Sequence, residues 1–502
     1  MNRGLRHAAD SYDVVVLGAG AGGMSAAVFA ALEGARVLLV ERTEYLGGTS
    51  AFSAATTWIP LTHHARTVGA EDSYEKVLGY LDNAVGNRAP RAMWEAFLKA
   101  GPGVVAELER RTEMKFRPRP LHPDYLSELE GSTACGRALE PEPFDARSLG
   151  DALKLIRPPI PEFTILGGMM IDRDDIPHLL KIGKSLESTV YSAKLIGKYY
   201  ISRLRYGRDT RLVMGNALIG RMLASALRLG VHILTETETV ALRSENGAVT
   251  GLTLRQNGET RDITVAGGIV LASGGFARHP RMRQEKLPHP VPEYSPSAPG
   301  HTGALHDLAF ELGAHHGEEA AQPCFWAPCS IRRRPDGTMA VFPHFVLDRS
   351  KPGIIAVGRD GRRFVNESTS YHLFGAAQFA VNRDGSHIPA YLIADSRALA
   401  KYGMGMIRPG GSDIRPFLAD GYLTEGATIE ELAGKLGIDA DGLKDSVARM
   451  NRYAETGVDE DFQRGTTVYQ RVNGDPSHGP NPTLGKLETP PFYAVQLWPR
   501  DI

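Results

Sequence analysis

The chain has 502 residues, which is more than one hydrophobic core usually serves, so we expect at least two domains. Hydrophobic residues make up 42% and charged residues 23%, as in soluble globular proteins, and the net charge is -1. This balance leaves no basic surplus that would indicate nucleic-acid binding, and no stretch reaches the roughly 18 uninterrupted apolar residues of a membrane span.

The first predicted elements form a βαβ unit. Residues 13–17 (DVVVL) are a short apolar run, which predicts a buried strand. The segment 18–23 (GAGAGG) follows and opens an alanine-rich helix that runs to residue 31. A second apolar run at 36–40 (RVLLV) predicts a parallel strand that ends at Glu41. Strand, glycine-rich turn, helix and strand within about thirty residues indicate a Rossmann-like fold.

The turn of this unit has the spacing of a dinucleotide site. Gly18 permits the tight turn, Gly20 lets the backbone approach a pyrophosphate, and Gly23 lets the helix pack closely on the strand. The N-terminus of the helix offers free N–H groups to the phosphates. We expect Glu41 to accept hydrogen bonds from the adenosine ribose.

The middle of the chain has a mixed pattern. Residues 121–162 are rich in proline and glycine, which predicts loops. Residues 181–206 have apolar positions at helical spacing with lysines and arginines between them, which fits either a surface helix or a helix on a membrane surface. Residues 235–265 alternate and contain two Asn-Gly turns, which predicts β-hairpins. A strand at 269–272 then leads into a Ser-Gly-Gly turn.

Two segments of small residues favour FAD over NAD as the dinucleotide. Residues 47–50 (GGTS) and then Ser53 follow soon after Glu41, so the chain there is able to run beside a flavin. The strand into residues 273–275 would pass under the dinucleotide. No second G-x-G-x-x-G follows a strand, so no NAD(P)H site is evident and we expect a separate electron acceptor.

Three segments in order, GAGAGGMSAA, GGTSAFSAATTWIP and GRRFVNES, resemble the flavoprotein family of fumarate reductases and 3-ketosteroid dehydrogenases. In that family the third segment, here Gly361 to Glu367, lies near the flavin. Residues 370–375 (SYHLFG) resemble the 3-ketosteroid Δ1-dehydrogenase branch, since fumarate reductases have an arginine acid in a Thr-Arg-Asp context there. The loop 122–125 (HPDY) and residues 136–143 resemble the same branch.

The resemblance implies an α/β fold in which a Rossmann-like FAD-binding domain carries an inserted α+β substrate domain. We expect the FAD-binding domain at residues 1–277 plus 491–502 and the substrate domain at 278–490, with the active site between them. FAD is expected to bind without a covalent link. The residues expected to contact it are Gly18, Gly20, Ala21, Gly22, Gly23, Glu41, Arg42, Gly48, Thr49, Ser50, Ser53, Ala54, Val240, Ala272, Ser273, Gly274 and Gly275.

The implied activity is oxidation of a CH–CH bond beside a ketone, such as 1,2-desaturation of a 3-oxosteroid or a similar lipophilic ketone. Hydride from the β carbon would go to the flavin, and a base must take the α proton. The resemblance places this base at Tyr371. The alternative is that Tyr371 is only an aromatic residue packed at a domain interface. A tyrosine with the usual pKa of about 10 needs a neighbour that stabilises phenolate.

In the family a second tyrosine supplies this help. Its equivalent falls on Leu126, and Tyr125 lies one place early. Either Tyr125 replaces it, or the help is missing and the substrate or the position of the bond differs. Two other functions stay open: an enoate reductase like the fumarate reductases, and a flavin-binding paralogue without turnover.

Cysteine and histidine patterns predict no metal site. Cys135, Cys324 and Cys329 are too few for a disulfide framework, which fits a reducing compartment and favours the cytoplasm. The last two lack a second pair at ligand spacing. None of the sixteen histidines shows ligand spacing, and only His372 lies beside a proposed site residue.

The family's chain normally continues beyond the segment that resembles residues 492–495. That continuation closes the FAD-binding domain and carries a Tyr-Pro-Gly-Pro-Gly loop that holds the substrate ketone. This sequence ends at Ile502, so the resemblance assigns no residue to the ketone. We expect residues 1–502 alone to bind FAD weakly and not to dehydrogenate ketosteroids, whether they are a fragment or a degenerate gene product.

Overall fold

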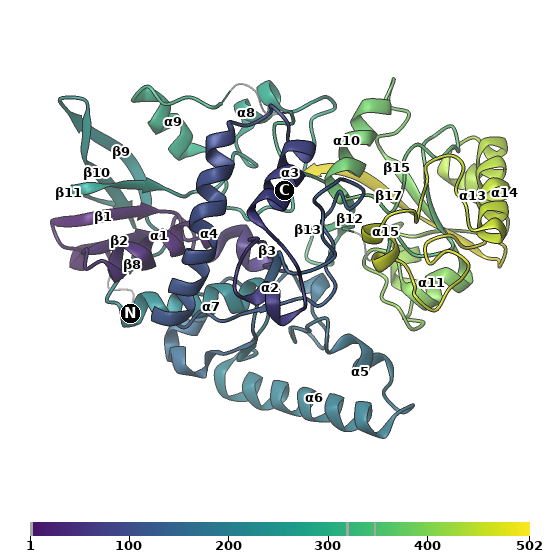
Figure 1. The fold of residues 1–502 in the computed structure, drawn as a ribbon, viewed down its shortest axis with the longest axis horizontal. Coiled ribbons are helices and arrows are strands. Elements are labelled where there is room, and N and C mark those ends of the chain that lie inside the picture. Colours follow the sequence, from purple (N-terminus) through teal and green to yellow (C-terminus); the bar gives the residue numbers. More distant parts are fainter. Residues whose placement is uncertain (1–3, 318–320, 346–347) are drawn as a thin grey trace.

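Two large sheets lie side by side, and the computed structural model describes residues 4–317, 321–345 and 348–502 (Figure 1). Figure 1 shows the first sheet at the left and the second at the right, with the long helix α6 (Leu186–Tyr206) below them. As predicted, the chain mixes helices and strands in both halves.

The first sheet contains the predicted βαβ unit. Across the sheet, its strands are β8 (His232–Leu234), β2 (Val37–Val40), β1 (Ser11–Leu17), β11 (Glu259–Leu271), β10 (Ala248–Gln256) and β9 (Glu238–Glu245). Helix α1 (Ala21–Leu32) connects β1 to β2, and β1 pairs in parallel with both β2 and β11. The predicted hairpins join β9, β10 and β11.

Neighbouring residues of β1 face two separate cores. Val16 packs with α1 and α7 (Met214–Arg228), whereas Val15 and Leu17 pack in the core on the opposite face. All three side chains are fully buried. A parallel strand that is covered on both faces is apolar throughout, which explains why the run DVVVL could be predicted as a buried strand.

The second sheet is antiparallel and includes the end of the chain. Across it, the strands are β13 (Met339–Pro343), β12 (Trp326–Arg333), β17 (Phe492–Asp501), β15 (Ala390–Asp395) and β14 (Ile354–Val357), with β16 (Thr424–Gly426) beside β17. β17 pairs with β12 and β15, so this strand lies in the second sheet, and the assignment of residues 491–502 to a domain stays a proposal. The apolar pattern of this segment predicts burial in a sheet but does not say in which one. The division of the chain at residue 277 stays a proposal.

Helices cover both faces of the second sheet. Ile354 and Ala356 of β14 face one core, and Ile355 and Val357 face the other. The helices of this half are α10 (Tyr371–Val381), α11 (Ser396–Tyr402), α12 (Arg415–Ala419), α13 (Ile429–Leu436), α14 (Ala440–Thr456) and α15 (Val468–Asn473).

Further elements precede β1, connect β2 to the rest of the first sheet, or connect the first sheet to the second. The strands are β3 (Thr57–Trp58), β4 (Phe116–Pro118), β5 (Ala138–Pro141), β6 (Phe144–Asp145) and β7 (Arg211–Leu212). The helices are α2 (His64–Thr67), α3 (Tyr74–Ala84), α4 (Arg91–Arg111), α5 (Ile176–Leu180), α8 (Pro280–Lys286) and α9 (Ala304–Glu311), and the 3-10 helices are η1 (Leu5–His7), η2 (Gly48–Phe52), η3 (Ala146–Leu155) and η4 (Pro161–Phe163). The predicted loop at 121–162 therefore contains short strands and 3-10 turns.

The helix expected within residues 181–206 is α6. Ser185 caps its start by accepting a hydrogen bond from the N–H of Ser188, and Gly207 ends it in the left-handed conformation. Among the residues that the structure describes, no helix combines the length and the apolar character needed to cross a membrane.

Candidate active site

A cavity of about 510 Å³ opens where three neighbouring parallel strands end. Leu17, Val40 and Leu271 are the last residues of β1, β2 and β11, they lie in register, and all three line the cavity. Ligands of doubly wound sheets bind in this position, outside the carboxyl ends of the strands. The N-terminus of α1 also faces the cavity, through Ala21 and Gly22.

Most of the residues predicted to contact FAD line this cavity. They are Gly18, Gly20, Ala21, Gly22, Glu41, Arg42, Gly48, Thr49, Ser50, Ala272, Ser273 and Gly274. Gly23, Ser53, Ala54, Val240 and Gly275 are not among its lining residues, and Thr239 lines it in place of its neighbour Val240.

The three glycines of the turn, Gly18, Gly20 and Gly23, are needed for different reasons. A Cβ on Gly18 would lie 2.3 Å from the carbonyl oxygen of Ala272, and a Cβ on Gly23 would lie 1.8 Å from the carbonyl oxygen of Gly18. These two glycines are therefore required by the packing of the fold itself. A Cβ on Gly20 would meet nothing closer than Ser50 Oγ at 3.7 Å. The protein leaves space at Gly20, as expected where a bound group approaches the backbone.

The carboxylate of Glu41 is held in place at the edge of the cavity. It accepts a hydrogen bond from the N–H of Ala19 at 3.1 Å and from the N–H and hydroxyl of Thr43 at 2.9 and 2.7 Å. Glu41 is buried. An oriented carboxylate at the end of the second strand matches the ribose-binding role predicted for it.

Two basic residues in the cavity were not predicted from the sequence. Arg157 is buried, and its Nε has no hydrogen-bond partner among the described residues. His301 lies 3.2 Å from the hydroxyl of Thr49. Burial lowers the pKa of both side chains, and the nearby Arg157 lowers the pKa of His301 further. Arg157 belongs to a loop with no motif, so the sequence offered no signal for it.

These observations test whether FAD fits the cavity. A buried guanidinium with a free donor is costly unless an anion compensates it. The free N–H groups at the start of α1 also favour an anion. The open space at Gly20 and the oriented Glu41 suit a pyrophosphate and a ribose. The residues present therefore fit FAD.

The two predicted catalytic tyrosines meet at a second place, between the two halves of the chain. Tyr125 donates a hydrogen bond to the hydroxyl of Tyr371 at 3.5 Å, and their rings meet edge to face. Tyr371 is the first residue of α10, whose start is capped by Ser370. Of the two open alternatives for the second phenol, the geometry favours Tyr125 as the replacement.

Two further aromatic residues surround this pair. Tyr469 of α15 lies 5.2 Å from the Tyr125 ring, and Phe345 lies 5.1 Å from the Tyr371 ring, both between ring centres. Desolvation, with the neighbouring hydroxyls of Tyr371 and Tyr469, raises the pKa of Tyr125 above its usual range. Tyr125 therefore remains protonated and serves as a donor. No sequence motif pointed to Tyr469.

A buried ion pair fixes the loop that carries Tyr125. Asp124 accepts hydrogen bonds from Trp58 Nε1 and Arg137 Nη1, each at 2.7 Å. Arg137 is itself paired with Asp72 at 2.7 Å, and all three charged side chains are buried. Because Asp124 is held on one side of the loop, Tyr125, the next residue, projects toward Tyr371.

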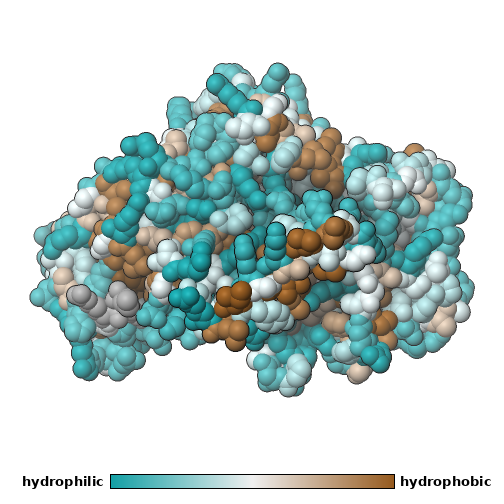
Figure 2. All heavy atoms as spheres, turned by 90° about the horizontal axis from the view of Figure 1, so that it is seen from below, coloured by the Kyte–Doolittle hydropathy of each residue, from teal (hydrophilic) through white to brown (hydrophobic). Residues whose placement is uncertain are grey.

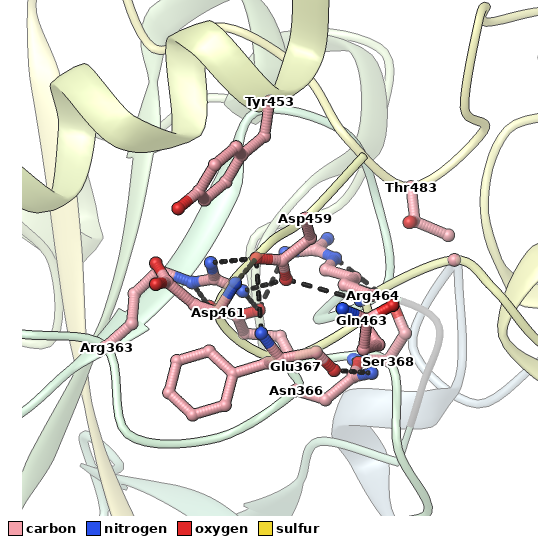
Figure 3. Close-up of polar contacts among 12 residues, drawn as sticks. Arg363, Asn366, Glu367, Ser368, Tyr453, Asp459, Asp461, Gln463, Arg464 and Thr483 are labelled. Carbon is pink, nitrogen blue, oxygen red and sulfur yellow. Dashed lines mark hydrogen bonds and ion pairs between the residues drawn. The ribbon is translucent and has the colours of Figure 1, made fainter. Parts of the chain in front are cut away.

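The segment Gly361 to Glu367 forms a buried ion cluster (Figure 3). Glu367 accepts hydrogen bonds from both Arg363 and Arg464, and Arg363 also pairs with Asp459. Burial alone would raise the pKa of Glu367, but the two guanidinium groups outweigh it and lower that pKa. No residue of the segment is among those that line the cavity. The cluster instead anchors the chain four residues before Tyr371.

His372, the histidine beside the proposed base, has a local partner. Its Nδ1 accepts a hydrogen bond from the N–H of Trp326 at 3.2 Å. Burial lowers the pKa of His372, which keeps the ring neutral. The contact fixes the start of α10 against β12.

Comparison with known proteins finds one matching family and several similar dehydrogenases. A family described as "FAD binding domain" matches residues 13–502. The chain is 35% identical to 4-oxocyclohex-2-ene-1-carboxylate 5-dehydrogenase of Sinomonas cyclohexanicum, over 98% of this chain and 83% of the relative. It is 33% identical to 3-oxosteroid 1-dehydrogenase of Mycolicibacterium smegmatis, over 98% of this chain and 86% of the relative.

Two solved structures share the fold. The crystal structure of 3-ketosteroid delta1-dehydrogenase from Sterolibacterium denitrificans, in complex with 1,4-androstadiene-3,17-dione, has a TM-score of 0.90 at 33% identity, covering 98% of this chain and 88% of that one. A flavocytochrome c3 fumarate reductase in an open conformation has a TM-score of 0.60 at 19% identity, covering 99% of this chain and 68% of that one, which shows a common fold alone.

Proposed function

Because the chain belongs to the FAD-binding flavoprotein family that includes the 3-oxosteroid 1-dehydrogenases, we propose that it introduces a double bond beside the ketone of a flat, lipophilic ring compound, first of all a 3-oxosteroid. The family membership confirms the predicted resemblance, the α/β fold class and the FAD cofactor. It also favours an FAD-dependent dehydrogenase over an enoate reductase.

The single observation that supports the residue roles is the hydrogen bond from Tyr125 to Tyr371. We propose Tyr371 as the base that takes the α proton of the ketone. Tyr371 takes this proton as a phenolate, after its own hydroxyl proton has gone to solvent, and the hydrogen bond donated by Tyr125 stabilises that phenolate. When bound in the cavity, FAD supplies the acceptor for the hydride from the neighbouring carbon. Phe345 and Tyr469 pack against the two rings and hold them in position.

The direct test is anaerobic bleaching of the flavin absorbance by a panel of substrates. The assay uses the full protein as its gene encodes it. Saturated 3-oxosteroids should bleach the flavin, and succinate should not. Bleaching by succinate alone would favour the enoate reductase, and a flavin that no ketone or succinate reduces would favour a paralogue without turnover.

A second substrate class has its own support, namely a ring ketone that carries a carboxylate. Two relatives are named for oxocyclohexane and oxocyclohexene carboxylates. The exposed cation Arg173 acts electrostatically on Tyr125, Tyr469 and His122, and burial together with Arg173 lowers the pKa of His122 to about 4. A cation beside the tyrosines suits an anionic substrate.

Arg173→Ala separates the two classes. It should raise KM for 4-oxocyclohexanecarboxylate and leave the kinetics of a 3-oxosteroid unchanged. Arg88→Ala, which removes an exposed arginine elsewhere, is the control. Equal effects of Arg173→Ala on both ketones would reject the carboxylate class.

We also propose that α6 contacts an anionic membrane surface, where lipophilic ketones concentrate. Leu186, Ile201 and Leu204 are 83%, 66% and 89% exposed, and they stand among exposed lysines and arginines of the same helix. Figure 2, seen from below, shows hydrophobic side chains gathered on the face where α6 lies. Apolar side chains between cations are typical of a helix at a membrane interface.

Cosedimentation with vesicles tests this contact. The protein should sediment with vesicles that contain anionic lipid, and Ile201→Asp combined with Leu204→Asp should abolish this. Leu312→Asp, at an exposed apolar residue outside α6, is the control. Sedimentation that is unchanged by the α6 variant would contradict the proposal.

Reoxidation of the flavin is proposed to need a separate electron acceptor in a reducing, cytoplasmic setting. The three cysteines are free, which supports such a compartment. A quinone or a redox dye should restore the absorbance of the bleached flavin. Rapid reoxidation by NAD⁺ instead would overturn this proposal.

A further inference from the structure

Two adjacent histidines and one glutamate lie together where the start of α2 meets the end of α4. His63 and His64 lie at the start of α2, and Glu109 lies in the last turns of α4. The Nε2 atoms of His63 and His64 lie 3.1 and 3.0 Å from the same carboxylate oxygen, Oε2 of Glu109. One potential ligand atom from each residue lies within 4.8 Å of the others.

The carboxylate is fixed toward the two rings. Its other oxygen, Oε1, accepts a hydrogen bond from the N–H of Phe116 at 2.9 Å. Lys115 approaches Glu109 only at its carbonyl oxygen, so the lysine does not neutralise the carboxylate. The side chains of His64 and Glu109 are only 12% and 13% exposed. The orientation of the group is therefore set by the fold and not by solvent.

The spacing of the two ring nitrogens and the carboxylate oxygen suits a bound cation. The two rings lie 4.1 Å apart at an angle of 34°, and the Nε2 atom of each faces the same carboxylate oxygen. In a tetrahedral site with metal–ligand bonds of about 2.0–2.1 Å, neighbouring ligand atoms lie roughly 3.3 Å apart, close to the two nitrogen–oxygen distances here. A metal ion would be bound by a lone pair of each ring nitrogen and by the carboxylate oxygen together.

We propose that His63, His64 and Glu109 bind a divalent transition-metal ion of the zinc class. Two imidazoles and a carboxylate suit Zn²⁺, whereas Mg²⁺ and Ca²⁺ prefer sites made of oxygen atoms. The side chain of His63 is 55% exposed, so the open side of the site admits water as a further ligand. The ion would tie the loop after β3 to α4, away from the cofactor cavity and from the tyrosines.

This site was not expected from the sequence. Adjacent histidines lack the spacing of a metal motif on a helix, and Glu109 is contributed by another helix, 45 positions after His64. The contact of the two histidines with Glu109 forms only when the chain folds. The proposal is independent of the substrate, because none of the three residues lines the cavity or contacts the tyrosine pair.

Calorimetric titration with ZnCl₂ tests the site. FAD-loaded protein is first stripped of metal with a chelator and dialysed. The wild type should bind one Zn²⁺ per chain and unfold at a higher temperature with zinc than without it. His64→Gln and Glu109→Gln should each abolish the binding and the thermal shift. His289→Gln, at an exposed histidine outside the cluster, should keep both.

Co²⁺ provides a second readout through its visible absorption bands, which appear only when protein ligands replace water. These bands should be present in the wild type and absent in the two variants. Retained flavin absorbance shows that a variant is folded. If Glu109→Gln does not fold, His63→Gln takes its place, because that side chain is half-exposed. The proposal fails if the wild type takes up no zinc, or if the variants bind as much zinc as the wild type.

Discussion

The cofactor cavity and the tyrosine pair are built in opposite ways. The cavity is lined by short runs of backbone at the ends of three parallel strands, and small residues are what make room there. The tyrosine pair consists of single side chains, Tyr125 and Tyr371, which are 246 positions apart and depend on buried charges for their placement. The comparison teaches that the first site is sensitive to added atoms, whereas the second is sensitive to lost contacts.

The largest effect is expected from atoms added at the turn. Gly23→Ala would place a Cβ 1.8 Å from a backbone oxygen, so we expect little folded protein. Gly20→Leu should fold, since its surroundings are open, but should lose FAD because the side chain fills the pyrophosphate path. Flavin absorbance and circular dichroism of purified protein measure both effects. Gly79→Ala, at a helical glycine with open space, is the control. Stoichiometric flavin in Gly20→Leu would contradict the assignment of the turn.

The next effect concerns the base itself. Tyr371→Phe should retain FAD but slow flavin reduction by the ketone about 10²- to 10⁴-fold, the usual contribution of one acid–base group. Stopped-flow absorbance under anaerobic conditions measures the rate. Phe differs only by the hydroxyl, so the packing against Phe345 is preserved. A rate close to that of the wild type would leave Tyr371 with a packing role alone.

The buried ion cluster around Glu367 should stabilise the folded protein. Glu367→Gln leaves Arg363 and Arg464 without their shared carboxylate, and removing one partner of a buried ion pair costs about 3–5 kcal/mol. Urea unfolding followed by fluorescence measures the loss in the free energy of unfolding. Glu431→Gln, at an exposed i,i+4 pair with Lys435, should change it far less.

The pH dependence of the free energy of unfolding tests the role of Glu367 further. The folded-state pKa of Glu367 is lowered, so its stabilising contribution is present above the unfolded pKa of about 4.3 and is lost as the pH falls through the folded value. The stability difference between the wild type and Glu367→Gln should therefore shrink in acid. A difference that stays constant down to acid unfolding would mean that the carboxylate charge is not what stabilises the fold.

The smallest effect is expected at the second tyrosine. Tyr125→Phe removes one hydrogen bond to the phenolate, which should slow flavin reduction about 10- to 100-fold. Because Tyr125 already donates this bond, Leu126→Tyr should leave the rate unchanged. A clear gain in rate from Leu126→Tyr, on a 3-oxosteroid, would show that the phenol is missing after all.

The sequence by itself determined the local features of this protein. The apolar run before Gly18, the glycines that follow and the acidic residue after the second strand specify the βαβ unit, because strand burial and tight turns depend on neighbouring residues. The Asn-Gly hairpins and the amphipathic helix α6 were predicted on the same ground.

Only the tertiary structure decided the contacts between distant segments. It directed Tyr125, and not Leu126, at Tyr371, because Arg137 holds the neighbouring Asp124. It placed Arg157 in the cofactor cavity, brought Glu109 to the two histidines, and put β17 in the second sheet. No local pattern encodes these choices, since each depends on which surfaces, far apart in the chain, become neighbours when the cores are buried.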